Sequence, residues 1–273
     1  MVVTNFPWLT VLVALPAAGA ALLGFVPPLR RAAGRVIALA IALVELAIGV
    51  YAAVTVFDWS APASYQLYES RAWIPQIGVT WSVAVTSLGL VMILLALALV
   101  PLVLIAGWDE DEDRGAYPAL VLALQAFMVL IFAAFDLAVF YFAFEAMLIP
   151  LYFMIGRYGV GDEAARHKAA MKFLLYSLFG GLIMLGGVLF IWALGSSTQS
   201  NTVAFFRMDT LAALLPNLSA SVQMVVFVSF MVTFAIKAPM VPVHTWLPDT
   251  AAVARPGTSV LLVGVLDKIG TFG

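Results

Sequence analysis

The sequence predicts an all-α fold, a polytopic transmembrane helix bundle of about eight helices in which prolines break the seventh. Two observations carry this prediction. First, 64% of the 273 residues are hydrophobic, only 10% are charged, and the mean hydropathy is +1.08, whereas a soluble domain is roughly 45–50% apolar and about 25% charged. Second, the 13 Lys and Arg and the 15 Asp and Glu are clustered. The clusters leave stretches near the roughly 20 residues that a helix needs to cross a bilayer.

The gaps between charged residues place the spans in order. No charge precedes Arg30, the second span contains one acid, Glu45, and residues 72–108 contain no charge at all. Asp136 suits the N-cap of the fifth helix because its side chain can accept bonds from the first free amides. The first six expected spans are 8–26, 36–57, 81–106, 117–134, 136–156 and 173–194.

The chain becomes less regular after the sixth span. A polar stretch, 195–201, leads into a short segment, 203–215, which we expect on the membrane surface. The seventh span starts near Ser221, and the eighth opens after Pro256 and is still apolar at the last printed residue. The prolines that interrupt the seventh span are Pro239, Pro242 and Pro248.

The composition also excludes several classes of function. So apolar a chain cannot be a cytosolic enzyme, a secreted domain or a disordered linker, and a net charge of −2 offers no basic surface for nucleic acid. Cysteine is absent, and His167 and His244 are 77 residues apart, which gives no metal-ligand spacing. No glycine-rich phosphate-binding loop is present. We therefore expect the chain itself to bind no cofactor, metal or nucleotide.

The basic residues predict the orientation. If the spans alternate, only Arg71 and Arg207 fall on one side, and nine Lys and Arg fall on the other. Because basic residues favour cytoplasmic loops, we expect the N-terminus outside and the Arg-rich loops in the cytoplasm of a bacterial plasma membrane. The nine are Arg30, Arg31, Arg35, Arg114, Arg157, Arg166, Lys168, Lys172 and Arg255.

Two further segments and one histidine have simple interpretations. The acidic run Asp109–Asp113 lies on the predicted cytoplasmic side and is interpreted as a solvated loop, with a docking surface as the alternative. The N-terminus has no basic leader and no convincing cleavage site, so we do not expect a cleavable signal peptide. His167 lies in a predicted cytoplasmic loop and is interpreted as an ordinary solvated residue.

Two ionisable residues are predicted near the midplane. An ionisable side chain there costs about 2.5–3.5 kcal/mol on insertion scales and usually serves a function. Glu145 follows Asp136 by nine residues, which is roughly 13 Å along a helix. Lys237 lies about sixteen residues into the seventh span, just before Pro239. Each charge offsets the desolvation of the other, and a pair that opens and closes suits proton relay. A static buried salt bridge is the alternative.

The proline-rich segment after Lys237 is the most informative stretch of the chain. Proline breaks a helix, and non-helical backbone at membrane depth is tolerated only inside protein or beside a wet cavity. Broken helices of this kind point to ion sites in transporters. His244 falls within the segment, and histidine titrates near physiological pH. We expect His244 on a proton path, with a structural role as the alternative.

Three other ionisable residues lie at membrane depth. Lys268 is about twelve residues into the eighth span, and we expect it to join the buried path. Asp267 precedes it, but adjacent helical residues do not face each other, so Asp267 either tunes the path or faces another subunit. Glu45 is isolated on span two, where packing or subunit contact is as good an interpretation as relay.

Three stretches of the chain resemble the antiporter-like membrane subunits of respiratory complex I. They are Phe144–Pro150 (FEAMLIP), Ala170–Phe173 (AMKF) followed by Leu175-Tyr176, and Lys237–Asp249 (KAPMVPVHTWLPD). The motifs are long, and the resemblance covers most of the chain from about Asp136 onward. It implies a proton-translocating, non-redox subunit of an NADH:quinone oxidoreductase. NADH, FMN, iron–sulfur clusters and quinone would then belong to partner subunits.

The resemblance also assigns roles and partners. It implies that Glu145 is the fifth-helix glutamate, Lys237 the broken-helix lysine, His244 a path histidine and Lys268 the connecting lysine of the eighth helix. It further implies fourteen core helices, so that 1–115 would hold helices one to three and 116–273 the start of the translocating module, helices four to eight. Other membrane subunits, including neighbouring antiporter-like ones, and lipid are the expected partners, and nucleic acid is not.

The chain departs from the family pattern at two places. After Asp249 the family often continues with Ala-His, whereas this chain reads Thr250-Ala251, and Asp267 beside Lys268 is unusual. Two other functions remain open. The chain could be a subunit of a multi-subunit sodium/proton antiporter, which resembles it in the same motifs. It could also be a passive structural subunit whose buried charges only hold helices together.

Overall fold

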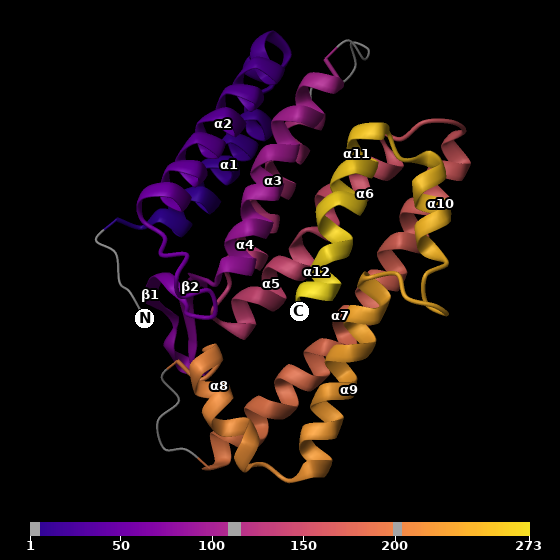
Figure 1. Cartoon of the computed structure of the whole chain (residues 1–273). Helices are drawn as coiled ribbons and strands as arrows, with labels where there is room; N and C mark the ends of the chain where they lie inside the picture. The colour runs from indigo at the N-terminus through magenta and orange to yellow at the C-terminus, as the bar shows by residue number, and fades with distance from the viewer. Residues whose placement is uncertain (1–5, 109–115, 199–203) are drawn as a thin grey trace.

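The computed structural model describes residues 6–108, 116–198 and 204–273 as a bundle of helices with one β-hairpin (Figure 1). Six helical stretches of the described residues are long and apolar enough to cross a membrane, one of them being Leu137–Gly156, which Met147 divides into two helices. The predicted all-α polytopic bundle is therefore confirmed. The acidic run 109–113, Arg114 and the end of the polar stretch at 199–201 lie outside the described residues.

Four helices form the N-terminal part, and the central one is buried along most of its length. It packs against the other three. The second helix begins at Pro27, where a missing amide hydrogen costs nothing, and not at residue 36. The three arginines of the expected loop, at 30, 31 and 35, lie on this helix instead. The helices are α1 (Trp8–Phe25), α2 (Pro27–Thr55), α3 (Ser87–Ala106) and α4 (Tyr117–Ala133), the last being the central one.

An antiparallel hairpin of β1 (Gln66–Ile74) and β2 (Val79–Val85) separates α2 from α3. The expectation that span three begins at residue 81 is therefore wrong, because the helix begins at Ser87, where the Thr86 hydroxyl accepts a bond from the Gly89 amide at 3.4 Å. The cause is that β2 is almost wholly buried. A buried strand has the same uninterrupted apolar pattern as a helix.

Two carboxylates fasten the hairpin to the helices. Glu69 accepts bonds from the first amides of α1, the nearest being Leu9 N at 2.7 Å. Asp136 caps the helix that begins at Leu137, as predicted, by accepting a hydrogen bond from Ala138 N at 2.9 Å. It also accepts from the Thr80 amide and hydroxyl at 2.9 and 2.8 Å. Burial raises the pKa of Asp136, although these bonds oppose the shift. The hairpin is thus a fixed part of the fold.

The fifth predicted helix is two helices. Pro150 has no amide hydrogen for the Ala146 carbonyl four residues earlier, and the helix breaks at Met147, directly after Glu145. The sixth helix starts at Glu163, ten residues earlier than expected. The elements here are α5 (Leu137–Ala146), α6 (Leu148–Gly156), α7 (Glu163–Thr198) and α8 (Met208–Leu214).

The last helices are short, apart from α9. The predicted break of the seventh helix is confirmed, because α9 stops at Lys237 and the next helix begins at Trp246. The eighth span opens at Pro256 as predicted, but it contains a π turn. The elements are α9 (Ala220–Lys237), α10 (Trp246–Val253), α11 (Pro256–Leu261), the π turn η3 (Leu262–Leu266), α12 (Asp267–Phe272) and the 3₁₀ turns η1 (Pro75–Ile77) and η2 (Leu215–Asn217).

Glycines bring α7 and α9 close together. A Cβ built on Gly180 would lie 3.3 Å from the Ile236 side chain, and one on Gly187 would collide with the Ser229 hydroxyl. The Thr233 hydroxyl donates to the Gly180 carbonyl at 2.6 Å. Small residues with an interhelical hydrogen bond are the usual means of helix association in membranes. The α7–α9 pair therefore holds the end of α9 in place.

The described basic residues outside the buried helices are unequally divided between the two ends of the bundle, and which end faces the cytoplasm stays a prediction. In Figure 1 the hairpin and α8 lie at one end, and Arg71 belongs to β1 while Arg207 immediately precedes α8. The Arg207 guanidinium packs 5.6 Å from the Tyr68 ring centroid. The other described basic residues of the predicted cytoplasmic set lie towards the opposite end, where α2 begins, α6 ends and α11 begins.

Candidate functional site

The break after α9 is caused by a proline and is held by a side-chain hydrogen bond. Pro239 cannot donate to Ala235, so the Met240 amide takes that carbonyl at 2.9 Å. The Ile236 carbonyl accepts from the indole nitrogen of Trp246 at 3.0 Å. Trp246 is fully buried. Its indole therefore satisfies one of the carbonyls that the end of α9 leaves free.

Lys237, the last residue of α9, is the most deeply buried basic side chain of the described chain, with 1% of its surface exposed. Its Nζ lies 5.5 Å from the centroid of the Phe144 ring and 5.6 Å from that of Phe173. Such contacts stabilise a desolvated cation by about 2 kcal/mol. Nζ has no hydrogen-bond partner within the described part of the chain. The ammonium is therefore held by aromatic faces and by charge.

Glu145 approaches this ammonium from α5 without touching it. The two groups interact electrostatically, but Lys237 Nζ has no hydrogen bond and the Glu145 Oε1 atom is also buried and unpartnered among the described residues. Gly181 of α7 makes room for the carboxylate, because a Cβ there would overlap Oε1. The predicted pair is thus brought together in one cluster, although not as a direct ion pair.

Asp267 is the second carboxylate of the cluster. It begins α12, and its Oδ1 is buried without a partner in the described residues. Lys237 interacts electrostatically with Asp267 as well as with Glu145. The sequence left the direction of Asp267 open, and this interaction makes the acid part of the surroundings of Lys237. We refer to Glu145, Lys237 and Asp267 as the buried charge cluster.

The other two predicted path residues, His244 and Lys268, make no described contact with Lys237. His244 is half-buried within the break, and its Nδ1 is buried with no hydrogen-bond partner among the described residues. Lys268 is exposed and donates to the Val263 carbonyl at 2.9 Å. No contact described for these two residues joins them to Lys237. Their place on the path stays a prediction.

A clamp outside the cluster joins α7 to the break. Lys172 and Asp249 form an ion pair at 2.8 Å, and the hydroxyls of Tyr176 and Thr245 are 2.8 Å apart. The bond from Lys172 lowers the pKa of Asp249. Sequence reasoning missed this clamp, although Lys172 and Tyr176 are one helical turn apart in a stretch noted for its resemblance. That spacing was the available signal.

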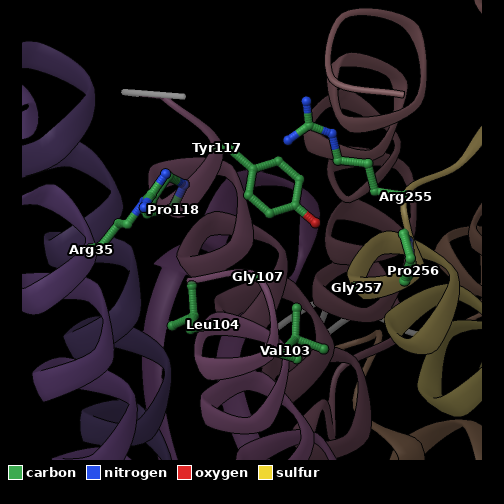
Figure 2. Close-up of a pocket in the computed structure, with 10 residues that line it drawn as sticks. Arg35, Val103, Leu104, Gly107, Tyr117, Pro118, Arg255, Pro256 and Gly257 are labelled. Carbon is green, nitrogen blue, oxygen red and sulfur yellow. The ribbon is translucent and has the colours of Figure 1, made fainter. Parts of the chain in front are cut away.

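A pocket lies between α2, α3, α4 and the start of α11 (Figure 2). The Arg255 guanidinium packs 5.8 Å from the centroid of the Tyr117 ring, whose hydroxyl is 2.9 Å from that of Thr258. Arg35 donates to the Trp108 carbonyl. A Cβ on Gly257 would lie 2.7 Å from the Val103 side chain. These contacts make the pocket a close-packed junction between the two parts of the bundle.

Glu45 lies apart from the buried charge cluster. Glu45 is fully buried in α2, and neither carboxylate oxygen has a partner in the described chain. It belongs to the N-terminal helices and not to the buried charge cluster. Across residues 6–108, 116–198 and 204–273, no group of three or more His, Asp or Glu side chains is placed to hold a metal ion.

Comparison with known proteins gives a family match and close relatives. The model of the transmembrane family described as NADH:quinone oxidoreductase/Mrp antiporter matches residues 134–273. The chain is 38% identical to NADH-quinone oxidoreductase subunit M of Mycobacterium tuberculosis, covering 98% of this chain and 54% of that protein. It is 35% identical to an NAD(P)H-quinone oxidoreductase chain 4 of Thermosynechococcus vestitus, covering 98% and 49%. The chain thus spans about half the length of these curated relatives.

Solved structures give the same result. A chain of respiratory complex I from Thermus thermophilus is 30% identical, with a TM-score of 0.79, covering 97% of this chain and 51% of that one. A chain of the Mrp complex from Dietzia is 20% identical, also with a TM-score of 0.79, covering 97% and 27%. At that identity the second likeness concerns the fold alone.

Proposed function

The chain belongs to the transmembrane family of NADH:quinone oxidoreductases and Mrp antiporters, and on that premise we propose that it is a proton-translocating subunit of an NADH:quinone oxidoreductase. The relative at 38% identity is named as a subunit of NADH-quinone oxidoreductase, and the one at 35% as a chain of NAD(P)H-quinone oxidoreductase. In this proposal the chain holds no redox group, and partner subunits bind NADH, FMN, the iron–sulfur clusters and quinone. Neighbouring antiporter-like subunits and lipid surround it.

One observation carries the proposal. The Lys237 ammonium is buried to 1% exposure at the end of a broken helix and has no hydrogen bond within the described residues. A charge so placed depends on its neighbours, because the interior screens far less than water. A purely structural lysine would ordinarily be paired and hydrogen-bonded. Lys237 is instead poised between groups that interact with it at a distance.

The mechanism follows from this dependence. When Glu145 moves toward Lys237, the ammonium is stabilised, and when it moves away, the lysine releases its proton more readily. The proton then passes through His244 and Lys268 toward the other half of the translocating unit. The break supplies the non-helical backbone that such a path requires at membrane depth. The N-terminus faces the outside and the Arg-rich end faces the cytoplasm.

The test is Lys237→Met in the full-length subunit within its complex. In membrane vesicles, NADH-driven quinone reduction and acidification of the lumen are recorded together after assembly has been checked. We expect the loss of most pumping at normal assembly. Lys168→Met is the matched control, because Lys168 is exposed near the start of α7, and it should pump as wild type. Wild-type pumping by Lys237→Met would contradict the proposal.

A subunit of an Mrp-type sodium/proton antiporter is the second candidate. It is favoured by the family description, which includes such antiporters, and by the fold likeness to the Dietzia complex. It predicts sodium-dependent proton movement without NADH. A passive structural subunit predicts instead that Lys237→Met changes assembly and leaves pumping per assembled complex unaltered. The same vesicles therefore separate the three functions.

A further inference from the structure

The buried charge cluster contains one more acid than a simple pair requires. Glu145 comes from α5 and Asp267 from the start of α12, and both interact electrostatically with Lys237 at the end of α9. Each acid has a buried oxygen with no hydrogen-bond partner in the described residues. One ammonium thus interacts with two carboxylates from different helices, and each of these has a buried oxygen without a hydrogen-bond partner in the described residues.

Helix packing fixes the direction of Asp267. A Cβ built on Gly270 would lie 2.7 Å from both the Phe234 carbonyl oxygen and the Ala238 nitrogen of the neighbouring chain segment. Only glycine allows α12 to approach the end of α9 so closely. Asp267 precedes Gly270 by three residues and therefore shares its face of the helix. Phe234 and Ala238 flank Lys237, so this face meets the buried lysine.

The π turn before α12 determines which residue occupies that position. A π turn holds one extra residue, so each later residue takes the angular position that its predecessor would hold in an unbroken α-helix. With α11 fixed, a continuous α-helix would direct Leu266 toward α9 in place of Asp267. The π turn covers Leu262–Leu266 and ends directly before the acid.

Lys268 does not take the position of Asp267 in the buried charge cluster. It is exposed, and its Nζ is bonded to the Val263 carbonyl within the π turn. Asp267 interacts electrostatically with both lysines. Its face of α12 packs against the end of α9 and its Oδ1 is buried, so the acid belongs to the cluster, whereas the neighbouring Lys268 is exposed.

We propose that Asp267 is a second counterion for Lys237, and that the ammonium exchanges between the carboxylates of Glu145 and Asp267 as α5 and α12 shift relative to α9. This inference rests on the proposed function. A lysine in a direct buried ion pair with one acid could move only by breaking that pair, which costs free energy. The exchange proposed here therefore accounts for the lack of a direct ion pair between Lys237 and either acid. Two carboxylates offer it two alternative positions.

The experiment measures protons moved per NADH oxidised in vesicles that contain the assembled complex. The variants are Asp267→Asn, Asp267→Glu, Glu145→Gln and the double variant Glu145→Gln/Asp267→Asn, with Lys237→Met as reference. Glu163→Gln is the matched control, because this carboxylate is exposed at the start of α7. We expect Asp267→Asn to lower the ratio several-fold and Asp267→Glu to retain most of it.

The double variant distinguishes a single shared step from two independent roles. If both acids serve one exchange step, losing either blocks it, and the double variant is no worse than the poorer single variant. Independent roles would multiply the two losses and would overturn the inference. If Asp267→Asn does not assemble, Asp267→Ser replaces it in the same comparison.

The remaining outcomes separate this inference from the proposed function. Wild-type pumping by Asp267→Asn, together with loss in Lys237→Met, would overturn the second counterion and leave the proposed function standing. Equal losses in Asp267→Asn and Asp267→Glu would show that shape matters and charge does not, which also overturns it. Wild-type pumping by Lys237→Met would contradict the proposed function itself.

Discussion

The indole nitrogen of Trp246 donates to the carbonyl oxygen of Ile236 at 3.0 Å, across the gap between α9 and α10. The ring also packs against Phe173, with centroids 5.3 Å apart. Phe173 in turn contacts the Lys237 ammonium. One buried tryptophan therefore holds together the broken backbone and an aromatic wall of the charge cluster.

Replacing this tryptophan should destabilise the break. Trp246→Phe keeps an aromatic ring but leaves the buried Ile236 carbonyl unsatisfied, which costs about 1–3 kcal/mol. We expect a lower thermal midpoint for the assembled complex, measured by loss of NADH-driven quinone reduction after heating. Trp192→Phe is the control, because the Trp192 indole nitrogen is buried and has no partner in the described chain. An equal loss in both variants would show that the hydrogen bond is not responsible.

The clamp between α7 and α10 has a predictable pH dependence. The pKa of Asp249 is lowered by Lys172, so its contribution is present above the ordinary aspartate value, about 3.9, and is lost as the pH falls through the lowered value. We expect hydrogen exchange in residues 238–250, corrected for its intrinsic pH dependence, to stay constant between about pH 5 and about pH 8. Exchange should increase only in stronger acid.

Asp249→Asn provides the comparison for the clamp. It should raise exchange in the same segment at neutral pH, and added salt should reduce the difference because the pair is partly exposed. Glu163→Gln, which changes an exposed acid on the first turn of α7, should leave the segment as in wild type. Loss of protection near neutral pH that occurs in wild type but not in Asp249→Asn would contradict the assignment.

Much of the bundle was predictable because charges are costly in a bilayer. The gaps between them gave the bounds of α1 and α4 within a residue or two, and the prolines from Pro239 onward gave the break after Lys237. The hairpin was not predictable in this way. Its second strand, Val79–Val85, is uncharged and buried, and hydropathy alone cannot distinguish such a strand from the start of a helix.

Two residues of the buried charge cluster could be singled out from the sequence, but the geometry of the cluster could not. Membrane depth and proline spacing identified Glu145 and Lys237, because an ionisable side chain at these positions is costly to insert and usually serves a function. The direction of Asp267 depends on a π turn at Leu262–Leu266, which has no simple sequence signature. The role of Gly181 was missed as well, since a glycine that makes room for a carboxylate from another helix becomes visible only in three dimensions.

That glycine gives the most direct test of where Glu145 must lie. A Cβ at position 181 would overlap the Glu145 carboxylate, whereas a Cβ at Gly186, on the same helix, would meet nothing within 4 Å. Gly181→Ala should therefore displace the carboxylate from Lys237 and reduce protons moved per NADH oxidised, at normal assembly. Gly186→Ala should pump as wild type and gain up to about 1 kcal/mol of helix stability.

The two alanine variants differ only in what the added methyl group meets. Both raise helix propensity equally, so a general effect on α7 would change pumping to the same extent in each. If Gly181→Ala pumps as well as Gly186→Ala, the carboxylate can work from more than one position, and the close fit against α7 has no part in proton transfer. A loss confined to Gly181→Ala places the working position of Glu145 in the space that this glycine leaves open, beside the ammonium of Lys237.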